Sequence, residues 1–504
     1  MLTLERSTIS DTRPVDRRPH AVVIGSGFGG LSAAIRLGAR GYRVTVLERL
    51  DAPGGRAYVH REAGFTFDAG PTIVTAPFLF EELWRLCGRT MADDVTLKAT
   101  DPFYRLRFDD GSVMDCHADP EAMRAEIARI SPGDLAGYDR FMVHSEAIYR
   151  VGFEQLGHAP FSSLADMLRI APDLLRLEGY RSVHGLVSRF VKHPKLRVVL
   201  TFQSLLVGGN PFATTSVYCL IAFLERRWGV HFAMGGTGSL VTGLVKLIEG
   251  QGGSVRCQQA VSEITVERGR ATGVRLASGQ HLAADVVVSN ADSATTYRHL
   301  IAPEHRKRWT DAKLHRARYS MSLFVWYFGT RRQYPDVAHH TIALGPRYQA
   351  LLTDIFERKL LAEDFSLYLH RPTATDPALA PPGCDTFYVL SPVPHLQSGT
   401  DWTVEAERYR RKIAERLEQT LLPGLQSEIV TSRLLTPIDF QERLSSFRGA
   451  AFGLEPVLTQ SAWFRGHNRD DHFANLYFVG AGTHPGAGIP GVVGSAKATA
   501  GLIV

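Results

Sequence analysis

The chain has 504 residues, more than one ordinary hydrophobic core accommodates, so two or three domains are expected. Its 44% hydrophobic and 21% charged residues are typical of a well-cored globular protein. The formal net charge of +6 is too mild to indicate nucleic-acid binding, and no nucleic-acid motif appears, but it is compatible with an anionic membrane surface.

Cysteine usage and the N-terminus bear on the compartment. The five cysteines have no CxxC spacing, which predicts neither a disulfide framework nor a metal site and favours a reducing compartment. Residues 1–20 are polar and lack the apolar core of a secretory signal, so we expect a disordered leader. The sequence has no run of about 18 apolar residues, and therefore no transmembrane segment is predicted.

The first structural signal lies near the N-terminus. Ala21–Ile24 is an apolar run typical of a buried parallel strand, and a glycine turn, a small-residue helix and a second apolar strand follow it. Gly25 permits a tight turn, Gly27 lets a pyrophosphate approach the backbone, and Gly30 lets the helix pack on the strand. Glu48 ends the second strand, where a carboxylate accepts hydrogen bonds from ribose hydroxyls. This order predicts a dinucleotide site.

The next segment indicates which dinucleotide binds. Many NAD-dependent dehydrogenases continue directly into another strand–helix unit, but here Pro53-Gly54-Gly55-Arg56-Ala57 adds a second glycine turn and an arginine. This extension resembles the glutathione-reductase-like FAD proteins of the amine oxidase and desaturase type. The resemblance implies that Arg56 neutralises the pyrophosphate or approaches the flavin; a solvated surface arginine is the alternative.

Between the two ends the pattern is first helical and then strand-like. Residues 120–228 show helical spacing, and residues 164–197 combine an apolar stripe with seven basic and three acidic side chains. That combination suits a helix lying on a membrane, and a solvated face over a helical core is equally compatible with it. Strands are expected at 254–256, 261–267, 271–276, 285–290, 319–328, 364–370 and 386–390, and an amphipathic helix at 403–422.

The C-terminus repeats the order of strand, glycine turn and helix. Residues 476–479 form an apolar strand, residues 480–491 are rich in glycine, and a small-residue helix ends the chain. Such a turn presents backbone N–H groups to an anion and leaves room for a planar ring against the backbone.

The two ends and the interior together resemble the bacterial-type phytoene desaturases, over residues 22–503. The motifs that carry the resemblance are GSGFGG at 25–30, PGGRA at 53–57, FDAGPT at 67–72, SLLVGGNPFATTS at 204–216, HHTIALGPRY at 339–348, SPVPHL at 391–396, EPVLTQSAWFR at 455–465 and VGAGTHPGAGIPGVVGSAKATAGL at 479–502. The resemblance implies non-covalent FAD and successive dehydrogenation of phytoene and partly desaturated carotenes, towards neurosporene or lycopene. The electron acceptor would be oxygen or a quinone.

The motifs and the resemblance together assign the contacts of FAD, and no metal ligands are predicted. The predicted contacts are Gly25, Gly27, Phe28, Gly29, Gly30, Glu48, Arg49, Gly54, Gly55, Arg56, Val261, Gly480, Gly482, Thr483, Gly488, Ile489, Pro490, Gly491 and Val492.

The predicted fold class is α/β plus α+β, in three parts. A discontinuous Rossmann-like FAD domain comprises residues 21–100, 229–292 and 440–504, and a β-sheet substrate domain comprises residues 101–119 and 293–439. Residues 120–228 would form a helical, membrane-facing subdomain. The expected localisation is peripheral, on the cytoplasmic side of the membrane, and the oligomeric state is left open.

The chemistry of such a substrate sets requirements for the site. A carotene has no polar functional group, so an apolar channel must select it by length and shape. Desaturation needs a hydride acceptor, which the flavin provides, and a proton acceptor or a cation-stabilising charge. The resemblance points to Asp166 as the acid/base group, although Ala165 stands where some relatives have an arginine. The alternative for Asp166 is a solvated residue on an amphipathic helix. Among the histidines, His484 in the C-terminal glycine turn is expected nearest the ring.

Other functions on this fold are considered beside the desaturase. One is another carotenoid desaturase or isomerase, and a second is an amine oxidase. The C-terminal glycine turn contains no cysteine, so covalent attachment of the flavin there is excluded. A prenyl-binding escort protein that has lost flavin is the non-enzymatic alternative, and the intact glycine set with Glu48 and Arg56 argues against it.

Overall fold

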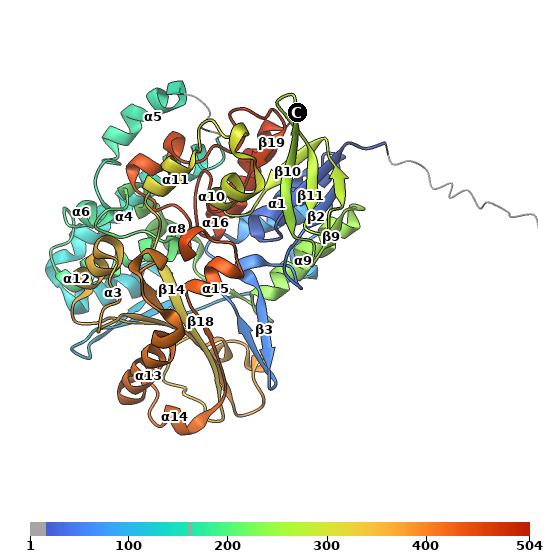
Figure 1. Ribbon diagram of the computed structural model, residues 1–504. Coiled ribbons are helices and arrows are strands. Elements are labelled where there is room, and N and C mark those ends of the chain that lie inside the picture. The colour runs from blue at the N-terminus through green and yellow to red at the C-terminus, as the bar shows by residue number, and fades with distance from the viewer. Residues whose placement is uncertain (1–16, 160, 162–163, 504) are drawn as a thin grey trace, which may run out of the picture.

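The computed structural model describes residues 17–159, 161 and 164–503, and two large sheets organise it (Figure 1). The first sheet is parallel and five-stranded, in the order β19-β13-β1-β2-β9. Its strands are β1 (His20–Ile24), β2 (Arg43–Leu47), β9 (Ser254–Arg256), β13 (Val286–Ser289) and β19 (Leu476–Phe478). Parallel pairing brings the carboxyl ends of strands from distant parts of the chain to one edge, where ligands bind in open α/β sheets.

Helix α1 joins the two ends of the chain in one core. It spans Phe28–Gly38 and packs against α9 (Thr237–Gly250) and α16 (Ile489–Leu502). A Cβ at Gly30 would overlap the carbonyl oxygen of Gly25, so only glycine lets α1 start this close to β1. The first and last segments of the described chain are thereby fixed against each other.

The second sheet is seven-stranded, in the order β18-β14-β17-β16-β15-β6-β7. Its strands are β6 (Tyr104–Arg107), β7 (Val113–Cys116), β14 (Ser322–Thr330), β15 (His340–Ala343), β16 (Leu367–His370), β17 (Asp385–Val393) and β18 (Ile429–Leu435). All neighbouring strands are antiparallel except β15 and β6, which are parallel. A parallel pair cannot be joined by a tight turn, and these two strands come from distant segments.

The central strand β14 is covered on both faces, which explains its continuous apolar sequence. Phe324 and Trp326 pack on one face against α13 (Trp402–Thr420). Leu323 and Val325 alternate with them and belong to the core on the opposite face. The sheet therefore presents an apolar floor to the rest of the molecule.

Three small antiparallel sheets complete the strands. They are formed by β10 (Val261–Glu267), β11 (Arg270–Leu276) and β12 (His281–Ala283), by β3 (Val59–Glu62) and β4 (Phe65–Asp68), and by β5 (Leu97–Ala99) and β8 (His231–Ala233).

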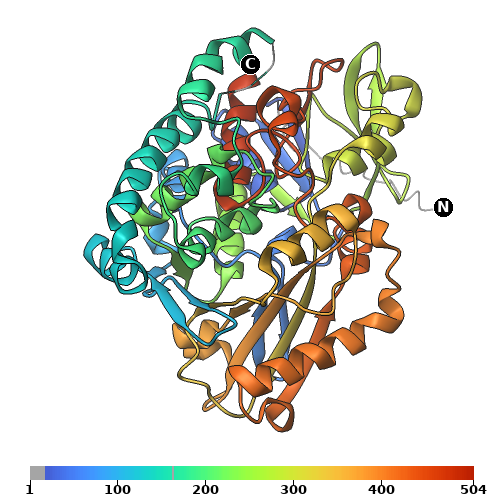
Figure 2. The same cartoon turned by 90° about the vertical axis from the view of Figure 1, so that its left-hand side faces the viewer.

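The remaining α-helices include those of residues 120–228, which lie together along one side of the molecule, in cyan and green in Figure 2. They are α2 (Pro77–Leu86), α3 (Pro120–Ile130), α4 (Leu135–Tyr149), α5 (Leu164–Arg176), α6 (Val183–Val187), α7 (Pro194–Val199) and α8 (Leu220–Trp228), followed later by α10 (Ser293–Thr295), α11 (Asp311–Arg316), α12 (Tyr348–Thr353), α14 (Leu425–Glu428) and α15 (Pro437–Glu442). In the described part of the chain, no helix is both long and apolar enough to cross a membrane.

The predicted mixed α/β class and the main predicted elements are confirmed, including the strands β10, β11, β14 and β17 and the helix α13. The sequence did not predict β3, β5, β8, β12, β15 or β18, since these strands are short or alternate with polar residues. Most of the predicted leader lies outside the described residues, and His20 already belongs to β1. The division into domains and the membrane-facing role of residues 120–228 stay predictions.

Candidate active site

A cavity of ≈ 670 Å³ is lined by residues of both large sheets. One wall consists of the glycine turns that follow β1 and β19, together with the segment after β2. A second part of the lining, the hydrocarbon wall, is apolar and comes from the seven-stranded sheet and the helices: Leu323, Val325, Ile342, Leu344, Leu367, Leu390, Leu435, Leu205, Leu206, Val207, Ile221 and Leu224. A ligand in the cavity would meet backbone N–H groups at the glycine turns and hydrocarbon side chains at this wall.

The glycine wall is built for close approach to the backbone. Gly25 has a φ of +90°, a conformation that only glycine adopts without strain. A Cβ at Gly29 would lie 2.6 Å from the Asn290 side-chain oxygen, and one at Gly480 would lie 2.7 Å from it. Asn290 follows β13, so the carboxyl ends of adjacent strands converge here. Asn290 was not among the predicted site residues, although its place directly after an apolar strand was the available signal.

Glu48 is held at the end of β2 by backbone and side-chain donors. Its Oε2 accepts hydrogen bonds from the Ser26 N–H at 2.9 Å and the Ser26 hydroxyl at 2.6 Å, and its Oε1 accepts one from the Leu50 N–H at 2.9 Å. It is buried and lies on the cavity wall. A carboxylate has further lone pairs, so Glu48 retains acceptor capacity for sugar hydroxyls.

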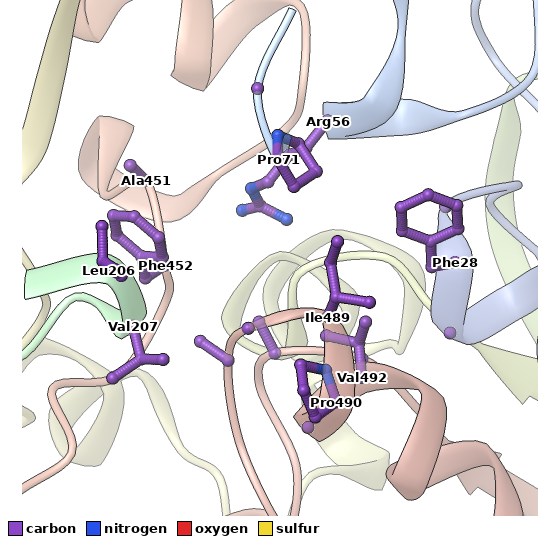
Figure 3. Close-up of a pocket in the computed structure, with 18 of the residues that line it drawn as sticks. Phe28, Arg56, Pro71, Leu206, Val207, Ala451, Phe452, Ile489, Pro490 and Val492 are labelled. Carbon is purple, nitrogen blue, oxygen red and sulfur yellow. The ribbon is translucent and has the colours of Figure 1, made fainter. Parts of the chain in front are cut away.

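Arg56 places an incompletely satisfied cation inside the cavity. Its guanidinium points into the space between Phe452 and Ile489 in Figure 3. One nitrogen donates to the Ser446 hydroxyl at 2.9 Å, while Nε is buried without a hydrogen-bond partner. Burial lowers the pKa of Arg56, and the nearby Asp292 carboxylate acts in the opposite direction. The free donor and the glycine cradle fit an anionic or carbonyl-bearing cofactor such as a flavin dinucleotide.

Most of the predicted cofactor contacts come together on this wall. The ones that line the cavity are Gly25, Gly27, Phe28, Gly29, Glu48, Arg49, Gly54, Gly55, Arg56, Val261, Gly480, Gly488, Ile489, Pro490, Gly491 and Val492. Gly30, Gly482 and Thr483 are not part of the lining; their contacts stabilise the conformation of the turns. A Cβ at Gly482 would overlap the Ser293 hydroxyl, and the Thr483 hydroxyl donates to the Gly466 carbonyl at 2.6 Å.

The predicted acid/base residue lies off the cavity. Asp166 is on α5, its side chain is 21% exposed, and its Oδ1 is 3.6 Å from an Arg169 nitrogen. Met167, Ile170 and Leu174 of the same helix line the cavity, but Asp166 does not. Its catalytic role stays a prediction without a contact to the cavity.

The structure reveals a different carboxyl group on the apolar side. Glu225 of α8 lines the cavity with 2% of its surface exposed, and its Oε1 accepts a hydrogen bond from the Tyr104 hydroxyl at 2.8 Å. Burial raises the pKa of Glu225 to about 8, and the hydrogen bonds from Tyr104 and Gln203 act in the opposite direction. Glu225 directly follows the apolar run 220–224 and precedes two arginines, so no signal in the sequence marked it as a buried residue.

Two groups of histidines have structural partners. His484 lines the cavity, its Nε2 contacts the Leu156 carbonyl at 2.9 Å, and burial lowers its pKa to about 4. His339, His340 and His370 form a buried cluster outside the lining, in which His339 and His370 Nε2 atoms are 3.1 Å apart. Burial lowers the pKa of all three, so the imidazoles are neutral and hydrogen-bond one another or nearby hydroxyl groups.

Comparison with known proteins decides the family. A family model described as "Flavin containing amine oxidoreductase" matches residues 28–504. A lycopene-forming phytoene desaturase from Pseudescherichia vulneris is 52% identical over 486 residues, which cover 96% of this chain and 98% of that protein. A neurosporene-forming phytoene desaturase from Cereibacter sphaeroides is 51% identical over 500 residues, which cover 98% of this chain and 96% of that protein. The chain belongs to the bacterial phytoene desaturase family.

Solved structures share the fold at low sequence identity. Cyclohexylamine oxidase from Brevibacterium oxydans has a TM-score of 0.61 at 15% identity, over 96% of this chain and 98% of that one. Putrescine oxidase with bound putrescine has a TM-score of 0.63 at 12% identity, with the same coverage. This likeness shows the fold alone. The family confirms the predicted flavin-dependent oxidoreductase, and the non-enzymatic alternative finds no support among these relatives.

Proposed function

We propose that this protein desaturates phytoene with non-covalently bound FAD, in successive steps towards neurosporene or lycopene. The observation that carries the proposal is one cavity whose lining combines a glycine-rich wall with a wall of hydrocarbon side chains. Half-identical relatives named as lycopene- and neurosporene-forming phytoene desaturases support this substrate. An amine oxidase is a weaker candidate, because the cyclohexylamine oxidase and the putrescine oxidase compared above are only 15% and 12% identical to this chain.

Named residues divide the work of binding the cofactor. The N-terminus of α1 and its glycine turn would receive the pyrophosphate, and Glu48 would accept the ribose hydroxyls. Arg56 would donate its unpartnered N–H to the pyrophosphate or the flavin. When bound, the flavin supplies the acceptor for a hydride from a saturated carbon of the substrate.

The protein itself orients the hydrocarbon and keeps water away. Apolar side chains of β14, β15 and β17 hold an extended chain by shape, because a carotene offers no hydrogen bonds. Thr72 interrupts this wall, but its hydroxyl lies 3.2 Å from each of the Tyr368 and Tyr388 hydroxyls. These polar groups satisfy one another, so they do not require water in the channel.

Helix α5 supports peripheral attachment to the membrane that holds the substrate. It lies at the edge of the molecule in Figure 1, with Leu168 68% exposed and Leu175 66% exposed. Arg169 and Arg176 on the same helix are also exposed. Another face of α5, with Met167, Ile170 and Leu174, lines the cavity. We propose that α5 lies in the headgroup region on the cytoplasmic side and admits carotenes to the cavity. Oxygen or a quinone remains the proposed terminal electron acceptor.

The test is product analysis with purified protein. The protein is incubated with phytoene in anionic liposomes, and the carotenes are separated by chromatography. Neurosporene or lycopene is the expected product. A yellow flavoprotein that leaves phytoene unchanged would refute the proposed substrate, and hydrogen peroxide formation with amines would support the amine oxidase. Isomerised phytoene without reduction of the flavin would indicate an isomerase, and a colourless protein that binds carotene would indicate an escort protein.

A further inference from the structure

We propose that Glu225 is the proton acceptor of the desaturation, a role for which the resemblance had pointed to Asp166. This inference rests on the proposed function, because it assumes a hydrocarbon substrate in the cavity. Two observations support it. Glu225 lies on the cavity wall, and the other carboxyl groups of the described lining are held by partners elsewhere on that wall.

The helix α8 directs Glu225 into the cavity. Leu220, Ile221 and Leu224 line the cavity together with Glu225, and residues at this spacing share one face of an α-helix. The next residue, Arg226, is rotated away and packs against the ring of Tyr138. The acid therefore takes the place of an apolar residue in the stripe that faces the substrate.

Three carboxyl groups belong to the described lining of the cavity: Glu48, Glu225 and Asp292. Glu48 is held by Ser26 on the nucleotide side. Asp292 accepts a hydrogen bond from the Thr295 N–H at 3.1 Å; burial raises its pKa, and this hydrogen bond and the charge of Arg56 act in the opposite direction. Of the three carboxyl groups in the described lining, Glu225 is therefore the one that belongs to the hydrocarbon wall.

The surroundings of Glu225 contain neutral polar groups rather than cations. Tyr104 of β6 donates to Oε1, and Gln203, of the short helix Phe202–Val207, places its amide nitrogen 3.5 Å from Oε2. Burial raises the pKa of Tyr104 and that of Cys116 of β7 well above their ordinary values, so both stay protonated. On α8 itself, Arg227 is exposed and lies over the Trp228 ring.

A buried acid without a cation beside it is costly, which calls for an explanation. The Gln203 side-chain oxygen is also buried without a partner, so the polar pair is incompletely satisfied. Buried polar groups without a hydrogen-bond partner and acids with a shifted pKa are found most often at catalytic and binding sites. A carboxyl group whose pKa lies near the working pH can accept a proton and release it again.

The proposed step balances as follows. Bound oxidised flavin would supply the acceptor for a hydride that leaves one saturated carbon with both electrons of its C–H bond. The proton on the adjacent carbon goes to a carboxylate oxygen of Glu225, and the electron pair of that second C–H bond forms the new C=C bond. The ionised form of Glu225 is required, so the rate should rise with pH through about 8 and level off above it.

The experiment compares Glu225→Gln with the wild type on phytoene in liposomes, from pH 6 to pH 9. We expect an unchanged flavin content, product formation reduced by about 100-fold or more, and loss of the pH-dependent rise. Glu121→Gln is the matched control, since Glu121 is 85% exposed on α3. A wild-type rate, or a retained pH-dependent rise, in Glu225→Gln would overturn the inference. So would a large loss of activity in Asp166→Asn that Glu225→Gln does not show.

A second variant decides the question if Glu225→Gln does not fold. Tyr104→Phe removes the hydroxyl that donates to the carboxylate, and this hydrogen bond lowers the pKa of Glu225. The midpoint of the pH–rate profile should therefore move to higher pH, and an unchanged midpoint would refute the role. A flavin-loaded wild-type protein that leaves phytoene unconverted would refute the proposed function itself, whereas active wild type with an equally active Glu225→Gln refutes only the inference.

Discussion

The buried acid Glu225 should impose a pH dependence on the stability of the whole protein, and Glu225→Gln should remove it. Burial raises the pKa of Glu225 from 4.5 to about 8. Between these values the unfolded chain carries an ionised glutamate while the folded protein keeps the group protonated. Stability is therefore fully present below pH 4.5 and falls as the pH rises towards 8. The glutamine variant has no such contribution.

The magnitude follows from the size of the shift. About 3.5 pH units at about 1.36 kcal/mol each amount to about 5 kcal/mol. A chain of 504 residues has an unfolding entropy of about 1 kcal/mol/K, from about 2.1 cal/mol/K per residue. The melting temperature of Glu225→Gln relative to the wild type should thus increase by up to about 5 °C between pH 4.5 and 8.

The assay is thermal unfolding of wild type and variant, followed by intrinsic fluorescence at half-unit steps of pH and one heating rate. The control Glu121→Gln should keep a constant offset from the wild type, because Glu121 is exposed. A constant offset for Glu225→Gln as well would refute the reasoning, since it would mean that the folded protein does not hold Glu225 in its neutral form.

Three further predictions concern the cofactor and the membrane. Gly27→Val should yield protein without flavin absorbance. Even a Cβ at Gly27 would lie 3.0 Å from the Asn290 amide nitrogen, and the larger valine side chain would fill the space through which the pyrophosphate approaches the backbone. A normal flavin-to-protein ratio in this variant would contradict the prediction. Acid precipitation should release the flavin into the supernatant, since the C-terminal glycine turn has no cysteine, and colour in the pellet would disprove non-covalent binding. The double variant Leu168→Asp/Leu175→Asp should no longer float with anionic liposomes. The control variant Val404→Asp should float as the wild type does, because Val404 is 66% exposed on α13, away from α5. Equal flotation of the double variant and the control would exclude α5 as the attachment site.

Local rules in the sequence were sufficient to predict the glycine wall. Gly25, Gly27 and Glu48 belong to one continuous strand–turn–helix–strand unit, so their spacing along the chain fixes their positions in space. The same holds for the glycines between β19 and α16, because a short turn joins two elements that pack on the same sheet. The long apolar strand β14 was also predictable, since burial on both faces requires apolar residues at every position.

Tertiary structure decided the acid/base candidates. Asp166 and Glu225 both lie in helices with apolar stripes, and the sequence alone distinguishes neither as the buried one. Burial depends on what packs over each helix: α8 is covered by β6 and the segment around Gln203, whereas α5 lies at the edge. Desolvation, which raises the pKa of Glu225, is a property of that packing and has no trace in the residue order.

The sequence by itself determined the family, the strand–turn–helix units at both ends and most residues of the glycine wall, because these features depend on backbone conformation within a few consecutive residues. Only the tertiary structure decided that Asn290 enters the glycine wall, that Arg56 points into the cavity with a donor unused, and that Glu225 stands on the hydrocarbon side. Those facts arise where segments far apart in the chain converge, and their contacts follow from the packing of the sheets rather than from local spacing.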